Sequence, residues 1–149
     1  MQKVIAFLNR ALSIEYSAVI QYCQHSALIQ GTDRVVYQDF LDGASKESRD
    51  HAKKVSDWIV SLGGLPTIEA AHIQQATDIG EMLAQNLSTE KDALQAYRDA
   101  HAAVDGEHPI KYMLEEQIIL EQDDVWEIEK FQRQHKISVK KKTIDLAAS

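Results

Sequence analysis

Cysteine, proline and glycine are all scarce in this chain, whose 149 residues include one cysteine, two prolines and six glycines. The single cysteine, Cys23, allows no disulfide within the chain and no Cys-x-x-Cys metal knuckle, and it fits a reducing compartment. Because turn-forming residues are so few, a many-stranded sheet is not expected and long helices are favoured. The length suits a single domain, which we expect to span residues 1–149.

Long apolar runs and an excess of basic residues are lacking as well. The first residues, MQKVIAFLNRALSIEY, contain Arg10 and Glu15 and form neither a signal peptide nor a membrane span. The formal net charge of −7 argues against a general nucleic-acid-binding protein and for affinity to cations. The three lysines at 140–142 are interpreted as a solvated end of the chain. We therefore expect a cytoplasmic protein that binds neither membranes nor nucleic acids.

Apolar residues recur at steps of three and four along four segments, which is the spacing of one face of a helix. The four stripes run from Val4 to Ile29, from Tyr37 to Leu62, from Leu83 to Val104 and from Ile110 to Phe131. The stretch from Leu65 to about Thr77 has no stripe and is expected to be a long crossover between the second and third helices. The sequence thus predicts an all-α, antiparallel four-helix bundle, followed by a tail at 136–149 that is a short helix or disordered.

Each predicted helix carries an acidic or imidazole side chain where its stripe calls for an apolar one. These residues are Glu15, His51, Glu90 and Glu121, with Asp124 one turn after Glu121. Taken singly, each glutamate is better explained by a position at the edge of the stripe, and the histidine by a hydrogen bond in the core. Together, four or five buried ionisable groups need shared compensation, which a pair of divalent cations provides. Carboxylates with imidazole suit iron or manganese.

Three segments of the chain, and more loosely a fourth, are similar to the helices of the bacterioferritins, within the ferritin-like di-iron superfamily. They are VIAFLNRALSIEYSAVIQY, HAKKVSDWIVSLGGLPT, DIGEMLAQNLSTEKDALQAYRDA and LEQDD. The resemblance implies a ferritin-like bundle with a di-metal site. It assigns metal ligands to Glu15, His51, Glu90 as a bridging glutamate, Glu121 and Asp124. It implies a catalytic set of Glu15, Glu90, Glu121 and the nearby tyrosine Tyr22.

The sequence departs from that family at three positions. Ser48 stands where the second helix should carry a glutamate, and we expect Glu47 rather than Asp50 to complete the metal site beside His51. Asp124 replaces the last histidine of the family, which implies either an asymmetric site or a site loaded with one metal. Arg49 replaces the methionine through which the family binds haem, so no haem is expected.

The function implied by this resemblance is binding and oxidation of ferrous iron by dioxygen or peroxide, with iron storage if a shell forms. The expected cofactor is a di-iron pair, with manganese or zinc as alternatives, and the expected assembly is a homo-oligomer built from dimers. One alternative is a peroxidase of the rubrerythrin type, which the lack of a Cys-x-x-Cys module argues against. Another is a non-enzymatic bundle with a degenerate metal site, which Ser48 favours.

Overall fold

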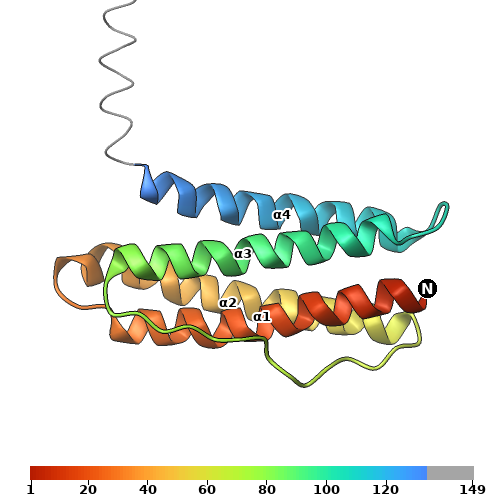
Figure 1. Cartoon of the computed structure of the whole chain (residues 1–149), viewed down its shortest axis with the longest axis horizontal. Helices are drawn as coiled ribbons and strands as arrows, with labels where there is room; N and C mark the ends of the chain where they lie inside the picture. The colour runs from red at the N-terminus through yellow and green to blue at the C-terminus, as the bar shows by residue number, and fades with distance from the viewer. Residues whose placement is uncertain (134–149) are drawn as a thin grey trace, which may run out of the picture.

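The computed structural model describes residues 1–133, and these residues form four helices and no strand (Figure 1). The helices are α1 (Gln2–Leu28), α2 (Thr32–Ser61), α3 (Ile79–Ala102) and α4 (Pro109–Gln132). The predicted all-α, antiparallel four-helix bundle is confirmed. The predicted tail at 136–149, including the lysines at 140–142, lies outside the described residues. No helix among the described residues combines the length and apolar character that a membrane span requires.

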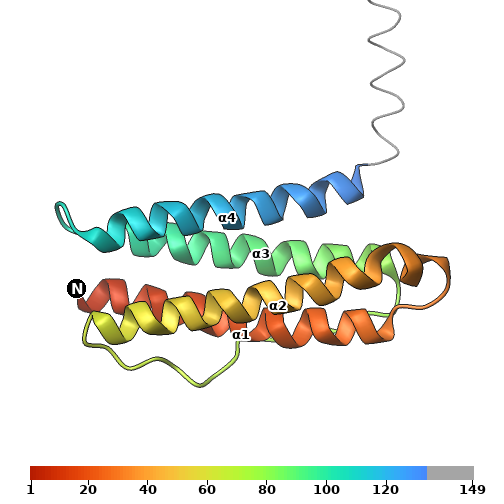
Figure 2. The same ribbon diagram turned by 180° about the vertical axis from the view of Figure 1, so that it is seen from behind.

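Two helical hairpins, α1–α2 and α3–α4, make up the bundle, and the main packing pairs are α1 with α2, α1 with α3, and α3 with α4. After α2 ends, the chain returns along the length of the bundle before α3 begins (Figures 1 and 2). The residues of this return, 64–76, have no helical or extended assignment, as predicted for the crossover. The long return makes α3 run antiparallel to α1, which brings the middle of each helix beside the middle of the other.

The crossover is held against α1 by hydrogen bonds along its length. The Asn9 side chain donates to the Leu65 carbonyl at 3.1 Å and accepts from the Thr67 amide at 2.8 Å. Further along, the Gln74 amide donates to the buried Gln21 Oε1 at 2.9 Å. These contacts give hydrogen-bond partners to backbone groups of a segment that has no regular secondary structure. They also fix where α3 starts, and Asp78 then caps it by accepting from the Glu81 amide.

The apolar core consists of two clusters at opposite ends of the bundle. One cluster contains Leu8, Leu12, Val55, Ile59, Ala100 and Leu114, and the other contains Ala18, Ile29, Tyr37, Leu41 and Met82. Full burial of one such aliphatic or aromatic side chain contributes about 1.5–3 kcal/mol, so the two clusters supply most of the folding energy. Between them lies a layer of buried polar and charged side chains, which includes Glu15, His51, Glu90 and Glu121.

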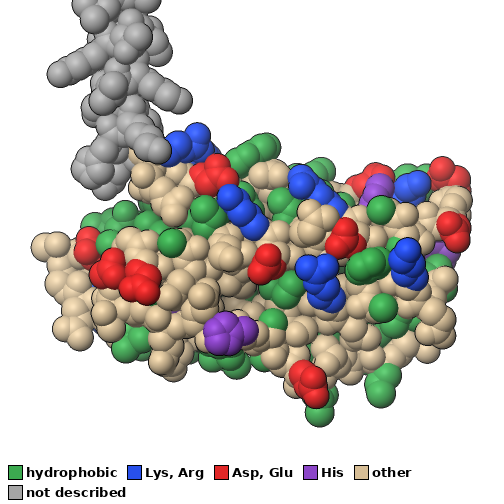
Figure 3. Space-filling view, in the orientation of Figure 1, with side chains coloured by type: hydrophobic (Ala, Val, Ile, Leu, Met, Phe, Trp, Pro, Cys, Tyr) green, Lys and Arg blue, Asp and Glu red, His purple; other side chains and the backbone are tan. Residues whose placement is uncertain are grey.

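The outer surface differs from this central layer in its pattern of charge. Figure 3 shows lysine, arginine, aspartate and glutamate side chains interspersed on the face seen in Figure 1. Within the described residues, this face carries no continuous basic patch of the kind that binds nucleic acids. The buried layer between the two apolar clusters, in contrast, brings several ionisable side chains together.

Candidate metal centre

Glu15 of α1, His51 of α2 and Glu121 of α4 meet in the middle of the bundle. The Nδ1 atom of His51 lies 3.0 Å from Glu121 Oε1 and 3.5 Å from Glu15 Oε1. The exposed fractions of Glu15, His51 and Glu121 are 2%, 5% and 0%. One ligand atom from each residue lies within 4.8 Å of the others, so a single cation placed between them can contact all three.

A second group joins α3 to α4. It consists of Glu90, Glu121 and Asp124, whose carboxylate oxygens also lie within 4.8 Å of one another. Glu121 belongs to both groups, whereas Glu90 belongs to this one alone. Two cations held by the two groups would therefore share Glu121. The geometry favours Glu121 as the bridging residue, while the resemblance to the bacterioferritins assigns a bridge to Glu90.

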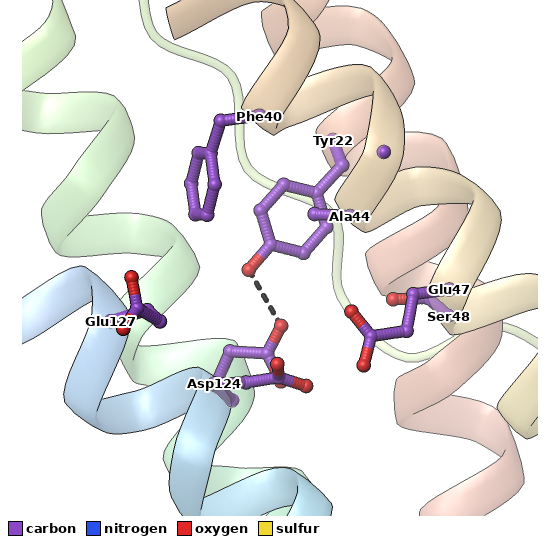
Figure 4. A pocket seen from close by; sticks show the side chains of 9 residues that line it. Tyr22, Phe40, Ala44, Glu47, Ser48, Asp124 and Glu127 are labelled. Carbon is purple, nitrogen blue, oxygen red and sulfur yellow. Dashed lines mark hydrogen bonds between the residues drawn. The ribbon is translucent and has the colours of Figure 1, made fainter.

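Glu47 approaches the same cluster from its exposed side. Its Oε1 lies 3.7 Å from His51 Nε2, and Glu47, His51 and Asp124 form a third group of potential ligands. In Figure 4 the carboxylates of Glu47, from α2, and Asp124, from α4, point toward one another across a pocket. Ser48 is buried but carries no carboxylate. Asp50 is exposed and belongs to none of the groups found among the described residues.

This pocket gives the centre an opening between α2 and α4. It has a volume of about 400 Å³. Its lining is Tyr22, Phe40, Gly43, Ala44, Glu47, Ser48, Glu90, Asp124 and Glu127 (Figure 4). Because four of these residues are acidic and the side chain of Glu47 is 45% exposed, the pocket leads from solvent to the buried carboxylates along an acidic wall. Such a route attracts cations.

Two buried tyrosines each hold one glutamate of the centre. Tyr22 of α1 donates its hydroxyl hydrogen to Glu90 Oε1 on α3 at 2.6 Å, and Tyr97 of α3 donates to Glu15 Oε1 on α1 at 2.7 Å. Each tyrosine follows the glutamate of its own helix by seven residues and bonds the glutamate of the other helix. The two bonds fix one oxygen of each glutamate, and the fixed Oε1 of Glu15 is also the atom that faces His51 Nδ1.

The sequence analysis included Tyr22 but missed two residues that touch the predicted ligands. Tyr97 lies on the buried stripe and is hard to distinguish from a packing residue, although its spacing from Glu90 repeats that of Tyr22 from Glu15. Gln117, on α4, is fully buried and donates its side-chain amide to Glu121 Oε1 at 2.7 Å. The signal for Gln117 was a polar residue one turn before Glu121 on the same helix face.

Burial and neighbouring charges shift the pKa values of the ionisable side chains in the centre. Burial, with the charge of Glu15, raises the pKa of Glu121 to about 7. Burial also raises the pKa values of Glu15 and Glu90 above their usual range, and the neighbouring Glu121 charge adds to the effect at Glu90. Burial lowers the pKa of His51, but its hydrogen bonds to Glu121 and Glu15 outweigh this and raise the pKa to about 11. The metal-free cluster therefore retains protons that balance its negative charge.

Divalent cations fit this donor set. The ligand atoms are carboxylate oxygens and imidazole nitrogen, which suit iron or manganese. Glu121 Oε2 is buried and has no hydrogen-bond partner among the described residues, as expected for an oxygen that faces a ligand. Because a bound cation replaces the retained protons, metal binding should release protons and strengthen as the pH rises.

Comparison with known proteins agrees with this arrangement. The ferritin-like domain model matches residues 5–137. The bacterioferritin of Streptomyces coelicolor is 27% identical over 72% of this chain, which spans 65% of that relative's length. A crystal structure of a ferritin-like, diiron-carboxylate protein from Bacillus anthracis superposes with a TM-score of 0.82 at 29% identity, covering 87% of this chain and 95% of that one. The bacterioferritin of Rhodobacter capsulatus, solved with a metal-free dinuclear site and haem iron, gives a TM-score of 0.76 at 29% identity, with 87% and 83% coverage.

A bundle of this topology, with carboxylates and imidazole converging from all four helices, defines the class of ferritin-like carboxylate proteins. The chain belongs to the family of the ferritin-like domain. The expected resemblance to bacterioferritins is confirmed at the level of family and fold.

The raised pKa values predict how the stability of the metal-free protein depends on pH. Between pH 4.5 and about 7, Glu121 keeps a proton in the folded protein that it has released in the unfolded chain. Between pH 6.5 and about 11, His51 likewise keeps a proton in the folded protein that it has released in the unfolded chain. The folded state therefore binds more protons, so the free energy of unfolding should fall as the pH rises through these ranges. For Glu121 the loss is on the order of 3 kcal/mol.

Thermal unfolding of chelator-treated protein across this pH range would measure the effect. Mn²⁺ should remove most of the dependence of the melting temperature on pH, because the cation takes the place of the retained protons. In the absence of metal, Glu121→Gln should show a weaker dependence of the melting temperature on pH than the parent protein, because glutamine cannot ionise. A melting temperature that rises with pH in the metal-free parent protein would contradict this account of the cluster.

Proposed function

We propose that this protein binds ferrous iron in pairs at the centre of the bundle and oxidises it with dioxygen or peroxide. The observation that carries the proposal is the place of Glu121, a fully buried carboxylate that belongs to two ligand groups and has one unpartnered oxygen. A buried charge of this kind is stable when cations share it. The family and the chemistry of the donors support iron as the substrate, with manganese or zinc as alternatives.

The residues have separate roles in this proposal. Glu127 attracts the ferrous ion at the pocket mouth, and Glu47 completes the metal site beside His51 and Asp124. Glu15, His51 and Glu121 hold one ion, and Glu90, Glu121 and Asp124 hold the other. Each ferrous ion supplies one electron. A pair of ions therefore reduces one dioxygen to hydrogen peroxide, or one hydrogen peroxide to two waters, and either reaction consumes two protons.

Tyr22 and Tyr97 keep Glu90 and Glu15 oriented toward the ions, and the protons consumed in this reduction come from solvent through the pocket.

The first test concerns the bridge. Parent protein should bind about two Mn²⁺ or Fe²⁺ ions per chain, as this fold does. Glu121→Ala should abolish binding of both ions, because both groups lose a ligand. Glu90→Ala should leave one ion, held by Glu15, His51 and Glu121. Isothermal titration under anaerobic conditions would count the ions. The opposite pattern, with one ion kept by Glu121→Ala and none by Glu90→Ala, would move the bridge to Glu90.

The second test concerns Glu47 in place of the missing glutamate at position 48. Its proximity to His51 Nε2 and Asp124 supports a ligand role, whereas the exposed Asp50 is a matched control on the same helix. Glu47→Gln should slow ferrous oxidation about tenfold or more, as loss of a charged contact does. Asp50→Asn should change it little. Stopped-flow absorbance with oxygen consumption measures both variants.

A non-enzymatic bundle is the second candidate, because Ser48 is buried where a carboxylate would complete the site and the Glu47 side chain is 45% exposed. The same experiment separates the two functions. If the parent protein binds metal ions without oxidising ferrous iron, and Glu47→Gln has no effect, the non-enzymatic reading replaces ours.

We further propose a homo-oligomer in the cytoplasm that contains no haem. The outer face of α1 and α2 carries a groove of about 570 Å³ whose lining includes Tyr16, Ile20, Arg49 and Lys53. An apolar groove of this kind supports pairing of two copies. Native mass spectrometry would give the size of the assembly.

Arg49 cannot serve as a thioether ligand to haem iron, and it carries a positive charge into the groove. Reconstitution with haem should therefore give no low-spin spectrum of a centre with two methionine ligands. Arg49→Met is the matched variant, since it restores the thioether at that position. A stoichiometric low-spin spectrum from the parent protein would contradict the prediction.

A further inference from the structure

Gln117 is a buried amide with both of its polar groups engaged. Its Nε2 donates to Glu121 Oε1 at 2.7 Å, and its Oε1 accepts from Lys54 Nζ at 2.8 Å. Gln117 lies one turn before Glu121 on α4, and Lys54 lies one turn after His51 on α2. The Lys54–Gln117 bond therefore runs beside the His51–Glu121 contact and joins the same two helices.

The lysine determines which way the amide points. A glutamine amide has one end that donates and one that accepts, whereas an ammonium group can only donate. Lys54 therefore holds the Gln117 oxygen toward itself, and this turns the NH₂ group toward Glu121. Without that ammonium group, the amide could rotate and present its oxygen to the carboxyl group of Glu121, and the hydrogen bond that holds Glu121 Oε1 would be lost.

Lys54 is available for this contact because it has no competing ion pair. Within residues 1–133, Lys46, Lys53 and Lys130 each pair with a nearby acidic residue, and Lys54 does not. Its ammonium group lies 6.0 Å from the centre of the Trp58 ring, one turn further along α2. An aromatic face at that distance attracts a cation and helps to restrain the side chain.

The contacts of Glu121 are divided unequally between its two oxygens. Oε1 accepts from Gln117 and faces His51 Nδ1, while Oε2 is buried with no partner among the described residues. We propose that Lys54 and Gln117 form a positioning relay that orients the side-chain carboxyl group of Glu121 and leaves Oε2 free for metal. This inference rests on the proposed metal-binding function. Neither relay residue touches the metal, and both act through Glu121.

Four variants test the relay. Lys54→Met and Gln117→Met each remove one hydrogen bond of the relay while keeping a side chain of similar length. Lys54→Arg keeps a side chain that donates hydrogen bonds and cannot accept them. Lys46→Met is the matched control, because this lysine lies on the same helix, is exposed and pairs with Asp42. Anaerobic Mn²⁺ titration followed by electron paramagnetic resonance gives the affinity without turnover. The melting temperature of each metal-free variant shows whether it is folded.

Lys54→Met and Gln117→Met should weaken Mn²⁺ binding about 10- to 100-fold, the usual effect of losing a hydrogen bond to a metal ligand. Lys54→Arg should retain most of the affinity, and Lys46→Met should match the parent protein. The double variant Lys54→Met/Gln117→Met should bind no more weakly than Gln117→Met alone, because the lysine acts only through the amide.

The metal-free protein offers an independent measurement. In ¹⁵N-edited spectra, the Gln117 side-chain NH₂ signals, identified by their loss in Gln117→Met, should lie downfield in the parent protein and in Lys54→Arg. They should move toward ordinary amide positions in Lys54→Met. If Lys54→Met does not fold, Lys54→Ala removes the same donor.

Three results would overturn the relay: parent-like affinity with unchanged NH₂ signals in Lys54→Met, additive effects in the double variant, or no rescue by Lys54→Arg. A parent protein that binds no Mn²⁺ refutes the metal-binding function itself and, with it, the positioning role. Loss of affinity confined to the relay variants leaves that function intact and supports the relay.

Discussion

Burial of ionisable groups in the middle of the bundle is the constraint on which the rest of this structure depends. Glu15, His51, Glu90 and Glu121 occupy the layer between two apolar clusters, and each would be costly to bury alone. The fold tolerates them because they contact one another and because buried tyrosine and glutamine side chains donate hydrogen bonds to them. The apolar ends stabilise the bundle, and the polar centre gives it its chemistry.

The tyrosines show how the two hairpins are matched at this layer. Since α1 and α3 are antiparallel, a spacing of seven residues on each helix places Tyr22 opposite Glu90 and Tyr97 opposite Glu15. The result is a pair of exchanged hydrogen bonds between α1 and α3 at the centre. A shift of α3 by one turn would break both bonds at once. The arrangement therefore defines the register of the hairpins as well as the orientation of the glutamates.

Much of the fold could be predicted from periodicity, because the stripes from Val4 to Ile29 and from Ile110 to Phe131 define the buried faces of their helices. The candidate ligands could be found because they interrupt those faces. Periodicity does not specify which side chain of one helix meets which of another. For that reason, the shared position of Glu121, the bond from Tyr97 to Glu15 and the contact between Lys54 and Gln117 emerged only from the structure.

The α2–α4 seam, with its pocket and its two polar links, has a mechanical consequence. These helices are not one of the main packing pairs, and at the centre they meet through His51 with Glu121 and through Lys54 with Gln117. Polar contacts of this sort can exchange with water, which interlocked aliphatic side chains resist. Three helix pairs are therefore joined by extensive packing, whereas α2 and α4 are joined at the centre by polar contacts. A cation that binds beside Glu121 and neutralises its charge would strengthen the contact between α2 and α4 that holds the cation in place.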